Sequence, residues 1–212
     1  IAGTAYMTGS ADGIGSAARF LAPGGLALDS SGNLYIADGS ARTIRKMVLS
    51  SGTVTTIAGS SGMIGSFDGI GTNALFGGPH GLSLDGNGNL FVADRGNNNI
   101  RKIVLSSGAV TTLAGMAGMT GGADGTGASA RFNSPMDVAA DRNGNLYVSD
   151  SANGTIRKVV VATGAVSTLA GMALYRGSSD GTGAAANFNA LEGLALDGSG
   201  NLYVADSGNQ AV

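Results

Sequence analysis

The sequence contains no cysteine and no tryptophan, only one histidine, and few charged residues. Without cysteine, neither a disulfide framework nor a thiolate metal site can form. Charged residues make up 12% of the chain and the formal net charge is −2, so the composition speaks against the phosphate backbone of a nucleic acid as a partner. No apolar run is long enough to span a bilayer, and we therefore expect no membrane insertion.

Glycine is abundant, with 38 residues against three prolines, and the glycines recur at fixed offsets. The stretch Gly-Asn-Leu-Tyr/Phe-Val/Ile-Ala/Ser-Asp begins at Gly32, Gly88, Gly144 and Gly200, which defines a repeat of 56 residues. A constant period of this size indicates a repeat architecture. We expect one domain over residues 1–212, with repeats at 1–56, 57–112, 113–168 and 169–212, the last incomplete.

Each repeat contains four strand signals, which in the first copy fall at residues 25–29, 33–38, 43–49 and 53–58. Short turns join them, as in antiparallel hairpins. Four antiparallel strands followed by one long connection are typical of a propeller blade. We therefore predict an all-β fold, a β-propeller of four-stranded antiparallel blades. The first strand should line the central channel, and the nearly continuous apolar second strand should be buried between blades.

The long connection between blades carries its own repeated pattern, an Asp-Gly-x-Gly motif followed by a phenylalanine eight residues after the aspartate. The motif begins at Asp12, Asp68, Asp124 and Asp180, and the aromatic residues are Phe20, Phe76, Phe132 and Phe188. Small residues before each phenylalanine favour a single helical turn. We expect the phenylalanine to fill the space between blades and to anchor a connection that would otherwise be too long to be ordered.

These motifs together resemble the NHL-repeat family of β-propellers. The resemblance is carried in register by Gly193–Asp197, Gly200–Asp206, Asn153 and Ile156–Lys158. Propellers of this family usually have six blades, so the resemblance implies that the chain is part of a larger, six-bladed propeller or is completed by a neighbouring molecule. The Asp-Gly-x-Gly connection resembles the variant found in large secreted bacterial proteins, which implies an extracellular or cell-surface location.

Most acidic residues belong to the repeat and have a structural interpretation. One set ends the second strand of each repeat, at Asp38, Asp94, Asp150 and Asp206. We expect these turn aspartates to accept hydrogen bonds from backbone N–H groups of the loop that leads to the third strand. A calcium loop needs several carboxylates within a few residues, whereas each loop here has one, so we expect no metal and no cofactor.

Arginine and lysine stand side by side in the third strand of each complete repeat. The pairs are Arg45/Lys46, Arg101/Lys102 and Arg157/Lys158. Neighbouring residues of a strand point to opposite faces. We expect one member of each pair to reach a turn aspartate and the other to meet water. Some NHL propellers bind RNA through a basic stripe, but that would need a positive excess that this chain lacks.

A few polar residues depart from the repeat and are the candidates for ligand binding: His80, Glu192, Asp137 and Arg95. His80 and Glu192 occupy the same repeat position, just before the channel-lining strand, and Asp137 lies one position further. Because strand directions alternate in a blade, all four residues should share one face of the disc. We predict that a ligand binds on that face.

The function that these residues favour is that of a non-enzymatic extracellular binding or scaffold module for adhesion or assembly. Its partners would be a protein or glycan ligand, or neighbouring copies in an assembly. The alternative is a lyase or hydrolase that acts at the channel mouth with a divalent metal. Some NHL-like propellers are lyases, and His80 with Glu192 or Asp137 would then be the reactive groups. A single histidine cannot reproduce the several metal-binding histidines of the peptide-amidating lyases, so we predict no catalytic residue.

Overall fold

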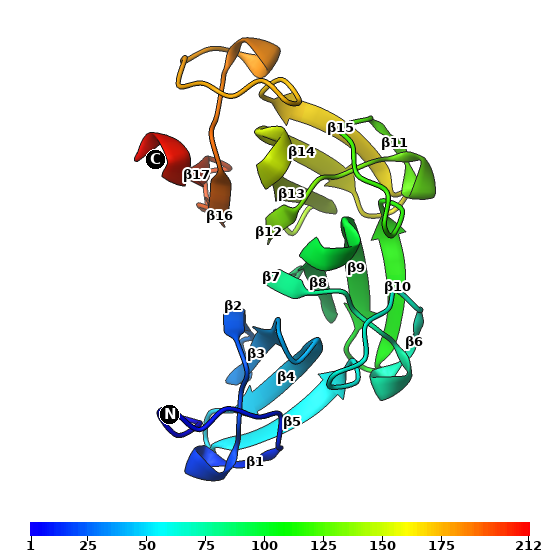
Figure 1. Cartoon of the computed structure of the whole chain (residues 1–212), viewed down its shortest axis with the longest axis vertical. Helices are drawn as coiled ribbons and strands as arrows, with labels where there is room; N and C mark the ends of the chain where they lie inside the picture. Colours follow the sequence, from blue (N-terminus) through cyan, green and yellow to red (C-terminus); the bar gives the residue numbers. More distant parts are fainter.

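Each repeat folds into one antiparallel sheet, and the four sheets stand side by side in an open arc (Figure 1). The structure, a computed structural model, describes residues 1–212. The three complete sheets have five strands and the same order, for example β1-β5-β4-β3-β2, and the fourth sheet consists of β16 and β17. We call the sheets blades 1 to 4. None of the helices is both long and apolar enough to cross a membrane.

The strand bounds repeat closely from blade to blade. Blade 1 contains β1 (Gly13–Ile14), β2 (Pro23–Leu28), β3 (Asn33–Asp38), β4 (Thr43–Val48) and β5 (Thr53–Ala58). Blade 2 contains β6 (Gly69–Ile70), β7 (Pro79–Leu84), β8 (Asn89–Asp94), β9 (Asn99–Val104) and β10 (Ala109–Ala114). Blade 3 contains β11 (Gly125–Thr126), β12 (Pro135–Ala140), β13 (Asn145–Asp150), β14 (Thr155–Val160) and β15 (Ala165–Ala170). Blade 4 contains β16 (Leu191–Leu196) and β17 (Leu202–Asp206).

The predicted all-β propeller fold and its four main strands are confirmed, with β2, β7, β12 and β16 on the inner side of the arc (Figure 1). The first strand begins two residues earlier than predicted. The arc does not close into a ring, and Leu26 and Leu28 on blade 1 are each 59% exposed. The larger, six-bladed propeller stays a prediction.

A fifth strand in each complete blade was not expected from the sequence. It comes from the Asp-Gly-x-Gly motif, whose middle residues pair with the outermost long strand, as Gly69 does with Val110. The next glycine, Gly71, has a φ of +58° and donates its N–H to the carbonyl of Gly108 at 2.9 Å. Because a side chain is disfavoured at this φ, the second glycine of the motif lets the chain turn from the fifth strand into a short 3₁₀ helix. That helix, η2 (Gly71–Asn73), is the predicted helical turn.

The core lies between blades, and the repeated phenylalanine is at its centre. Phe76 is fully buried in a cluster that includes Tyr35 and Ile44 of blade 1 and Leu82 and Val92 of blade 2. Phe132 occupies the corresponding place between blades 2 and 3. The predicted role of these residues as anchors of the long connection is therefore confirmed.

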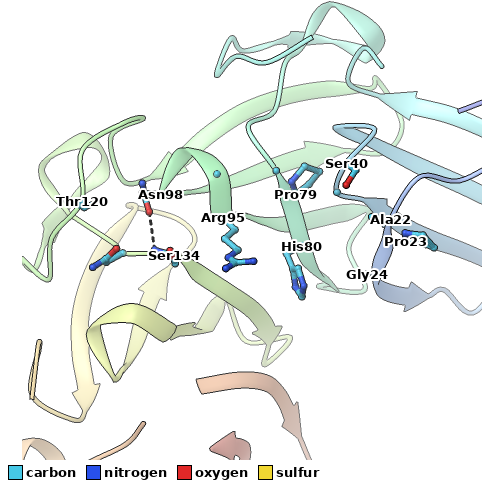
Figure 2. A pocket seen from close by; sticks show the side chains of 14 residues that line it. Ala22, Pro23, Gly24, Ser40, Pro79, His80, Arg95, Asn98, Thr120 and Ser134 are labelled. Atoms are coloured by element: carbon cyan, nitrogen blue, oxygen red, sulfur yellow. Dashed lines mark hydrogen bonds between the residues drawn. The ribbon is translucent and has the colours of Figure 1, made fainter. Parts of the chain in front are cut away.

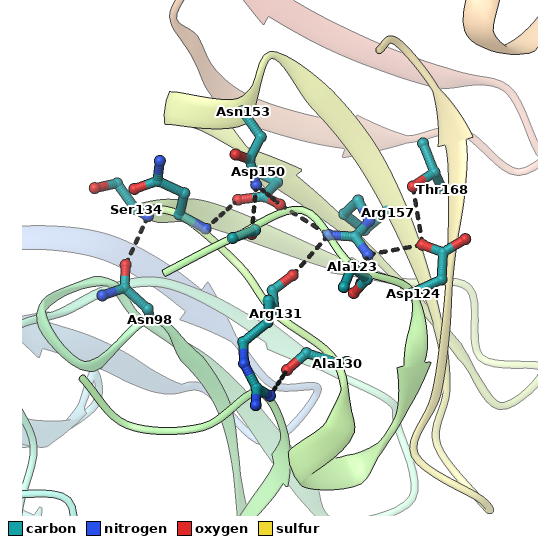
Figure 3. A network of polar contacts seen from close by, with 12 residues as sticks. Asn98, Ala123, Asp124, Ala130, Arg131, Ser134, Asp150, Asn153, Arg157 and Thr168 are labelled. Carbon is teal, nitrogen blue, oxygen red and sulfur yellow. Dashed lines mark hydrogen bonds and ion pairs between the residues drawn. The ribbon is translucent and has the colours of Figure 1, made fainter. Parts of the chain in front are cut away.

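The arginine of each Arg-Lys pair is fully buried and joins the long connection to the blade. Figure 3 shows this arrangement for Arg157. Arg157 contacts Asp150 at 2.9 Å and Asp124 at 2.8 Å, and its guanidinium lies over the ring of Phe132, 5.2 Å from the centroid. It also donates to the main-chain carbonyl of Arg131 at 2.8 Å. We call this arrangement the arginine clamp; Arg45 and Arg101 form it in blades 1 and 2. The adjacent lysines are only half-buried, as the sequence predicted.

The turn aspartates at the end of the second strand accept backbone hydrogen bonds, but the predicted donors were wrong. The backbone donors lie 16 or 17 residues earlier, in the segment before the first strand: Asp94 accepts from the N–H groups of Gly77 and Gly78 at 3.0 and 2.9 Å. From its own loop Asp94 accepts only a side-chain bond, from Asn97 at 2.6 Å. Each such aspartate therefore ties the start of the inner strand to the end of the second strand, as Asp38, Asp150 and Asp206 also do.

Replacing Phe76 by Ala should lower the free energy of unfolding by about 3–5 kcal/mol, because a large buried side chain is lost and a cavity is left between blades 1 and 2. Phe67, in the same long connection, is 70% exposed and provides the matched control. Urea unfolding followed by circular dichroism measures both variants. Equal midpoints for Phe76→Ala and Phe67→Ala would show that the aromatic side chain does not anchor the connection.

We predict an unusually high pKa for the buried aspartate Asp150. Burial raises the pKa of Asp150 to about 6, against the opposing effects of the hydrogen bonds from Asn133 and Asn153 and of the charge of Arg157. Because the folded pKa lies above the unfolded one, the contribution of this group to stability is present below its ordinary pKa of 3.8 and is lost as the pH rises through about 6.

Carboxyl-carbon NMR titration of Asp150 tests this, with Asp141 as the control. Burial acts to raise the pKa of Asp141, but the hydrogen bonds from Asn145 and Asn143 outweigh it and lower the pKa. We expect two separate transitions, with that of Asp150 at the higher pH. If Asp150 titrates at the same pH as Asp141, burial is not the dominant influence on the pKa of Asp150.

Candidate functional site

The strand register divides the arc into two faces. In blade 2 Pro79 pairs with Asp94, and Leu84 pairs with Leu90 at the other end of the same hairpin. The starts of the inner strands therefore lie beside the segments that follow the second strands, residues 39–42, 95–98, 151–154 and 207–210. We call this side the loop face. The hairpin turns near Asp29, Asp85, Asp141 and Asp197 lie on the opposite side, the turn face.

A cleft of about 630 Å³ opens on the loop face (Figure 2). Its size is within the range of roughly 300–1,000 Å³ that is usual for ligand pockets. Blades 1, 2 and 3 and the connection before blade 3 all contribute to it, and its lining is mostly glycine and polar residues. The lining residues are Ala22, Pro23, Gly24, Gly39, Ser40, Gly78, Pro79, His80, Arg95, Gly96, Asn98, Thr120, Asn133 and Ser134. We call it the blade 2 cleft.

Two of the four predicted ligand-binding residues, His80 and Arg95, meet in this cleft (Figure 2). The half-buried His80 lies near the start of β7, and its Nδ1 is 3.1 Å from the carbonyl oxygen of Met136 in blade 3. Since a carbonyl only accepts, Nδ1 carries the proton of this hydrogen bond, and Nε2 is left free in the neutral ring. Nε2 faces blade 1: a Cβ on Gly24 would lie 3.7 Å from it.

Arg95 opens the short 3₁₀ helix η3 (Arg95–Asn97) and is exposed. The ion pairs of the protein are those of the three clamp arginines, and Arg95 has no carboxylate partner and no protein acceptor for its guanidinium. Its donors therefore remain available to a molecule in the cleft. No Asp or Glu is among the lining residues.

Asp137 does not line the cleft, and each of its two carboxylate oxygens accepts a backbone hydrogen bond. One oxygen accepts from the N–H of Val138 and the other from the N–H of Leu194 in blade 4, both at 2.9 Å. Burial raises the pKa of Asp137, although these two bonds and the charge of His80 act to lower it. Asp137 therefore joins the inner strands of blades 3 and 4, and its predicted role in ligand binding stays a prediction.

Glu192 is on the loop face as predicted, but in blade 4 and outside the blade 2 cleft. Its side chain is exposed, and one carboxylate oxygen accepts from the hydroxyl of Ser207 at 3.2 Å. His80 and Glu192 thus share a repeat position and a face without sharing a site. No group of three or more His, Asp or Glu side chains in the structure is placed to hold a metal ion.

Other polar residues of the cleft were not predicted from the sequence. Asn98 accepts the N–H of Ser134 at 2.8 Å and so joins the loop of blade 2 to the start of blade 3. Both residues have a positive φ, +57° for Asn98 and +54° for Ser134. The sequence signal was weak, because the repeat places unrelated residues at both positions and only the fold brings them into contact.

The match to a known family fits this geometry. The model of the NHL repeat matches residues 76–103 and 132–159, each of which runs from the phenylalanine anchor through the clamp arginine. The chain belongs to the NHL-repeat family. A similar curated protein, NHL repeat-containing protein 2 of Bos taurus, is 34% identical over 182 residues, which cover 81% of this chain and 25% of that protein. The NHL chain thus spans about a quarter of the length of the curated relative.

Solved structures support the propeller fold of this NHL chain. An auxiliary nutrient binding protein of Bacteroides ovatus matches 92% of the chain and 48% of its own length, with a TM-score of 0.72 and 20% identity. A further curated relative is a probable peptidyl-alpha-hydroxyglycine alpha-amidating lyase of Caenorhabditis elegans, 37% identical over 76 residues, which cover 36% of this chain and 20% of that protein.

Proposed function

We propose that this NHL propeller is a non-enzymatic binding module that acts outside the cell, in adhesion or assembly, and takes its protein or glycan ligand on the loop face. The observation that carries the proposal is the blade 2 cleft, into which Arg95 and His80 project with donors and acceptors that no protein group uses. Unpaired polar groups that converge in a cleft on a rigid scaffold are the usual basis of a binding site.

The pattern of departures from the repeat supports the same function. Residues that hold the blades together recur every 56 positions, whereas His80 and Arg95 occur once each. In repeat folds the scaffold is shared by many proteins, and function resides in the positions that vary on it. The similarity to a protein described as nutrient binding agrees with a binding role. The extracellular location rests on the resemblance of the Asp-Gly-x-Gly connection to that of secreted bacterial proteins.

The second candidate function is a lyase or hydrolase that acts at the channel mouth with a divalent metal. The similarity to an amidating lyase over 36% of the chain favours it. The geometry around His80 favours binding instead. Both oxygens of Asp137 accept backbone N–H bonds, and Glu192 stands in another blade. A general base would need a partner within hydrogen-bond reach of the reacting proton.

Binding on the loop face predicts a clear difference between two exposed arginines. Arg95 lies on the loop face and Arg142 in a hairpin turn of the turn face, so Arg95→Gln and Arg142→Gln remove the same charge from opposite sides. A labelled chain is screened on an array of neutral and acidic glycans and immobilised secreted proteins. For each ligand found, we expect Arg95→Gln to weaken binding at least about tenfold, or 1.4 kcal/mol, and Arg142→Gln to have no effect.

The reverse pattern would place the ligand on the turn face and refute the proposal. Incubation of the chain with a peptide ending in α-hydroxyglycine, with and without added magnesium or zinc, tests the lyase alternative. Product formation that is lost in His80→Ala would establish an enzyme and contradict the non-enzymatic assignment.

A further inference from the structure

We propose that the blade 2 cleft recognises an acidic sugar, with Arg95 holding the carboxylate of a uronate and His80 accepting a hydrogen bond from one of its hydroxyl groups. This inference rests on the proposed function, because it names the ligand class of the same cleft.

The first argument is the contrast between Arg95 and the arginines whose guanidinium groups are held by protein acceptors. Arg45, Arg101 and Arg157 are fully buried and each pairs with two aspartates. Arg19 and Arg131 donate to nearby backbone carbonyls. Arg95 instead projects into the cleft with no acceptor from the protein (Figure 2). The planar fork of a guanidinium matches a carboxylate, which it can bind with two parallel hydrogen bonds.

The second argument is the orientation of the histidine ring. The hydrogen bond from Nδ1 to the carbonyl of Met136 fixes the ring and leaves Nε2 toward the open side beside Gly24. In the neutral ring Nε2 is an acceptor, so its natural partner is a hydroxyl group. The two side chains are therefore suited to bind different groups of one ligand, an anion at Arg95 and a hydroxyl group at His80.

The third argument comes from the same positions in the other repeats. Where repeat 2 has His80 and Arg95, repeat 1 has Gly24 and Gly39, and both of these glycines also line the cleft. Blade 1 therefore leaves room at the two positions where blade 2 supplies functional side chains. A Cβ on Gly39 would come within 3.1 Å of the carbonyl oxygen of Pro79, so a side chain there would crowd the cleft.

The remaining lining residues favour a sugar over a peptide. They are hydroxyl and amide side chains, Ser40, Asn98, Thr120, Asn133 and Ser134, together with glycines and the small residues Ala22, Pro23 and Pro79. No aromatic side chain and no Leu, Ile, Val or Met is among them. Peptide recognition normally uses apolar pockets for side chains or pairing to a free strand edge. A ligand covered with hydroxyl groups can instead form hydrogen bonds throughout such a lining.

Acidic groups do not oppose an anion in the cleft. The lining contains no carboxylate. Asp137 is the acid whose charge interacts with His80, and its two oxygens are turned to the N–H groups of Val138 and Leu194.

The test compares methyl β-D-glucuronide with methyl β-D-glucoside, which differ only in having a carboxylate or a CH₂OH group on the ring. NMR titration of the full 212-residue chain measures both affinities. We expect the glucuronide to bind at least tenfold more tightly. Arg95→Ser should abolish this preference, since serine is the residue at the same position of repeats 3 and 4, Ser151 and Ser207. Arg142→Ser is the matched control and should leave the preference intact.

His80→Met uses the residue of repeat 3 at the same position, Met136, and should weaken both sugars by a similar factor while keeping the preference for the acid. Equal affinities of the wild-type chain for the two sugars would overturn the inference, and so would an unchanged preference in Arg95→Ser. Acetate or inorganic phosphate binding as tightly as the glucuronide would also overturn it, because the cleft would then bind any small anion.

The variant Gly24→Met shows whether a negative result contradicts only the acidic-sugar inference or also the proposed function. It should fill the cleft next to His80 and block every ligand that binds there. If it abolishes binding of a neutral glycan or a protein found on the array while the glucuronide never binds, the cleft is the ligand site and only the acidic-sugar inference is wrong. If all such ligands bind normally to Gly24→Met, the proposed use of the cleft is wrong as well.

Discussion

The structure depends on one buried guanidinium in each complete blade. Arg101 is fully buried and bonds to the carbonyls of Leu75 and Phe67 and to Asp68, with Asp94 3.5 Å away. A buried cation is costly unless its hydrogen bonds and charge are satisfied, so these groups must come together when the blade folds. The partners lie in the long connection and at the end of the second strand. The arginine clamp thereby fixes the connection, which has few regular backbone bonds of its own.

The clamp also places the candidate site. Asp94 pairs with Arg101 and accepts the N–H groups of Gly77 and Gly78, immediately before Pro79 and His80. The position of His80 therefore follows from the repeated network, although histidine occurs at this position only once. Arg95 directly follows Asp94 in the chain. The repeat forms the rigid frame. His80 and Arg95, which depart from the repeat and lie opposite two glycines of blade 1, provide polar groups of the cleft.

Much of this architecture could be predicted from the sequence, because its causes are local and periodic. Four strand signals per repeat, the phenylalanine anchor and the burial of one residue of each Arg-Lys pair all follow from patterns that recur in register. The fifth strand could not be predicted, since it is only two residues long and depends on a glycine conformation. The donors to Asp94 and the partner of Asp137 were missed because both are distant in sequence and are set by how inner strands pack. The same packing explains why His80 and Arg95 meet while Glu192 stays apart.

The claim that the clamp orders the connection is tested most directly by hydrogen exchange in Arg101→Met, with Lys102→Met as the control. The amides of Gly71 and Leu75 report on the connection through their bonds to Gly108 and Phe67, and the amides of β8 and β9 report on the sheet. We predict that Arg101→Met lowers protection in the connection by a larger factor than in the sheet, and that Lys102→Met changes neither. Equal losses in the connection and the sheet, or undiminished protection at Gly71 and Leu75, would contradict the account.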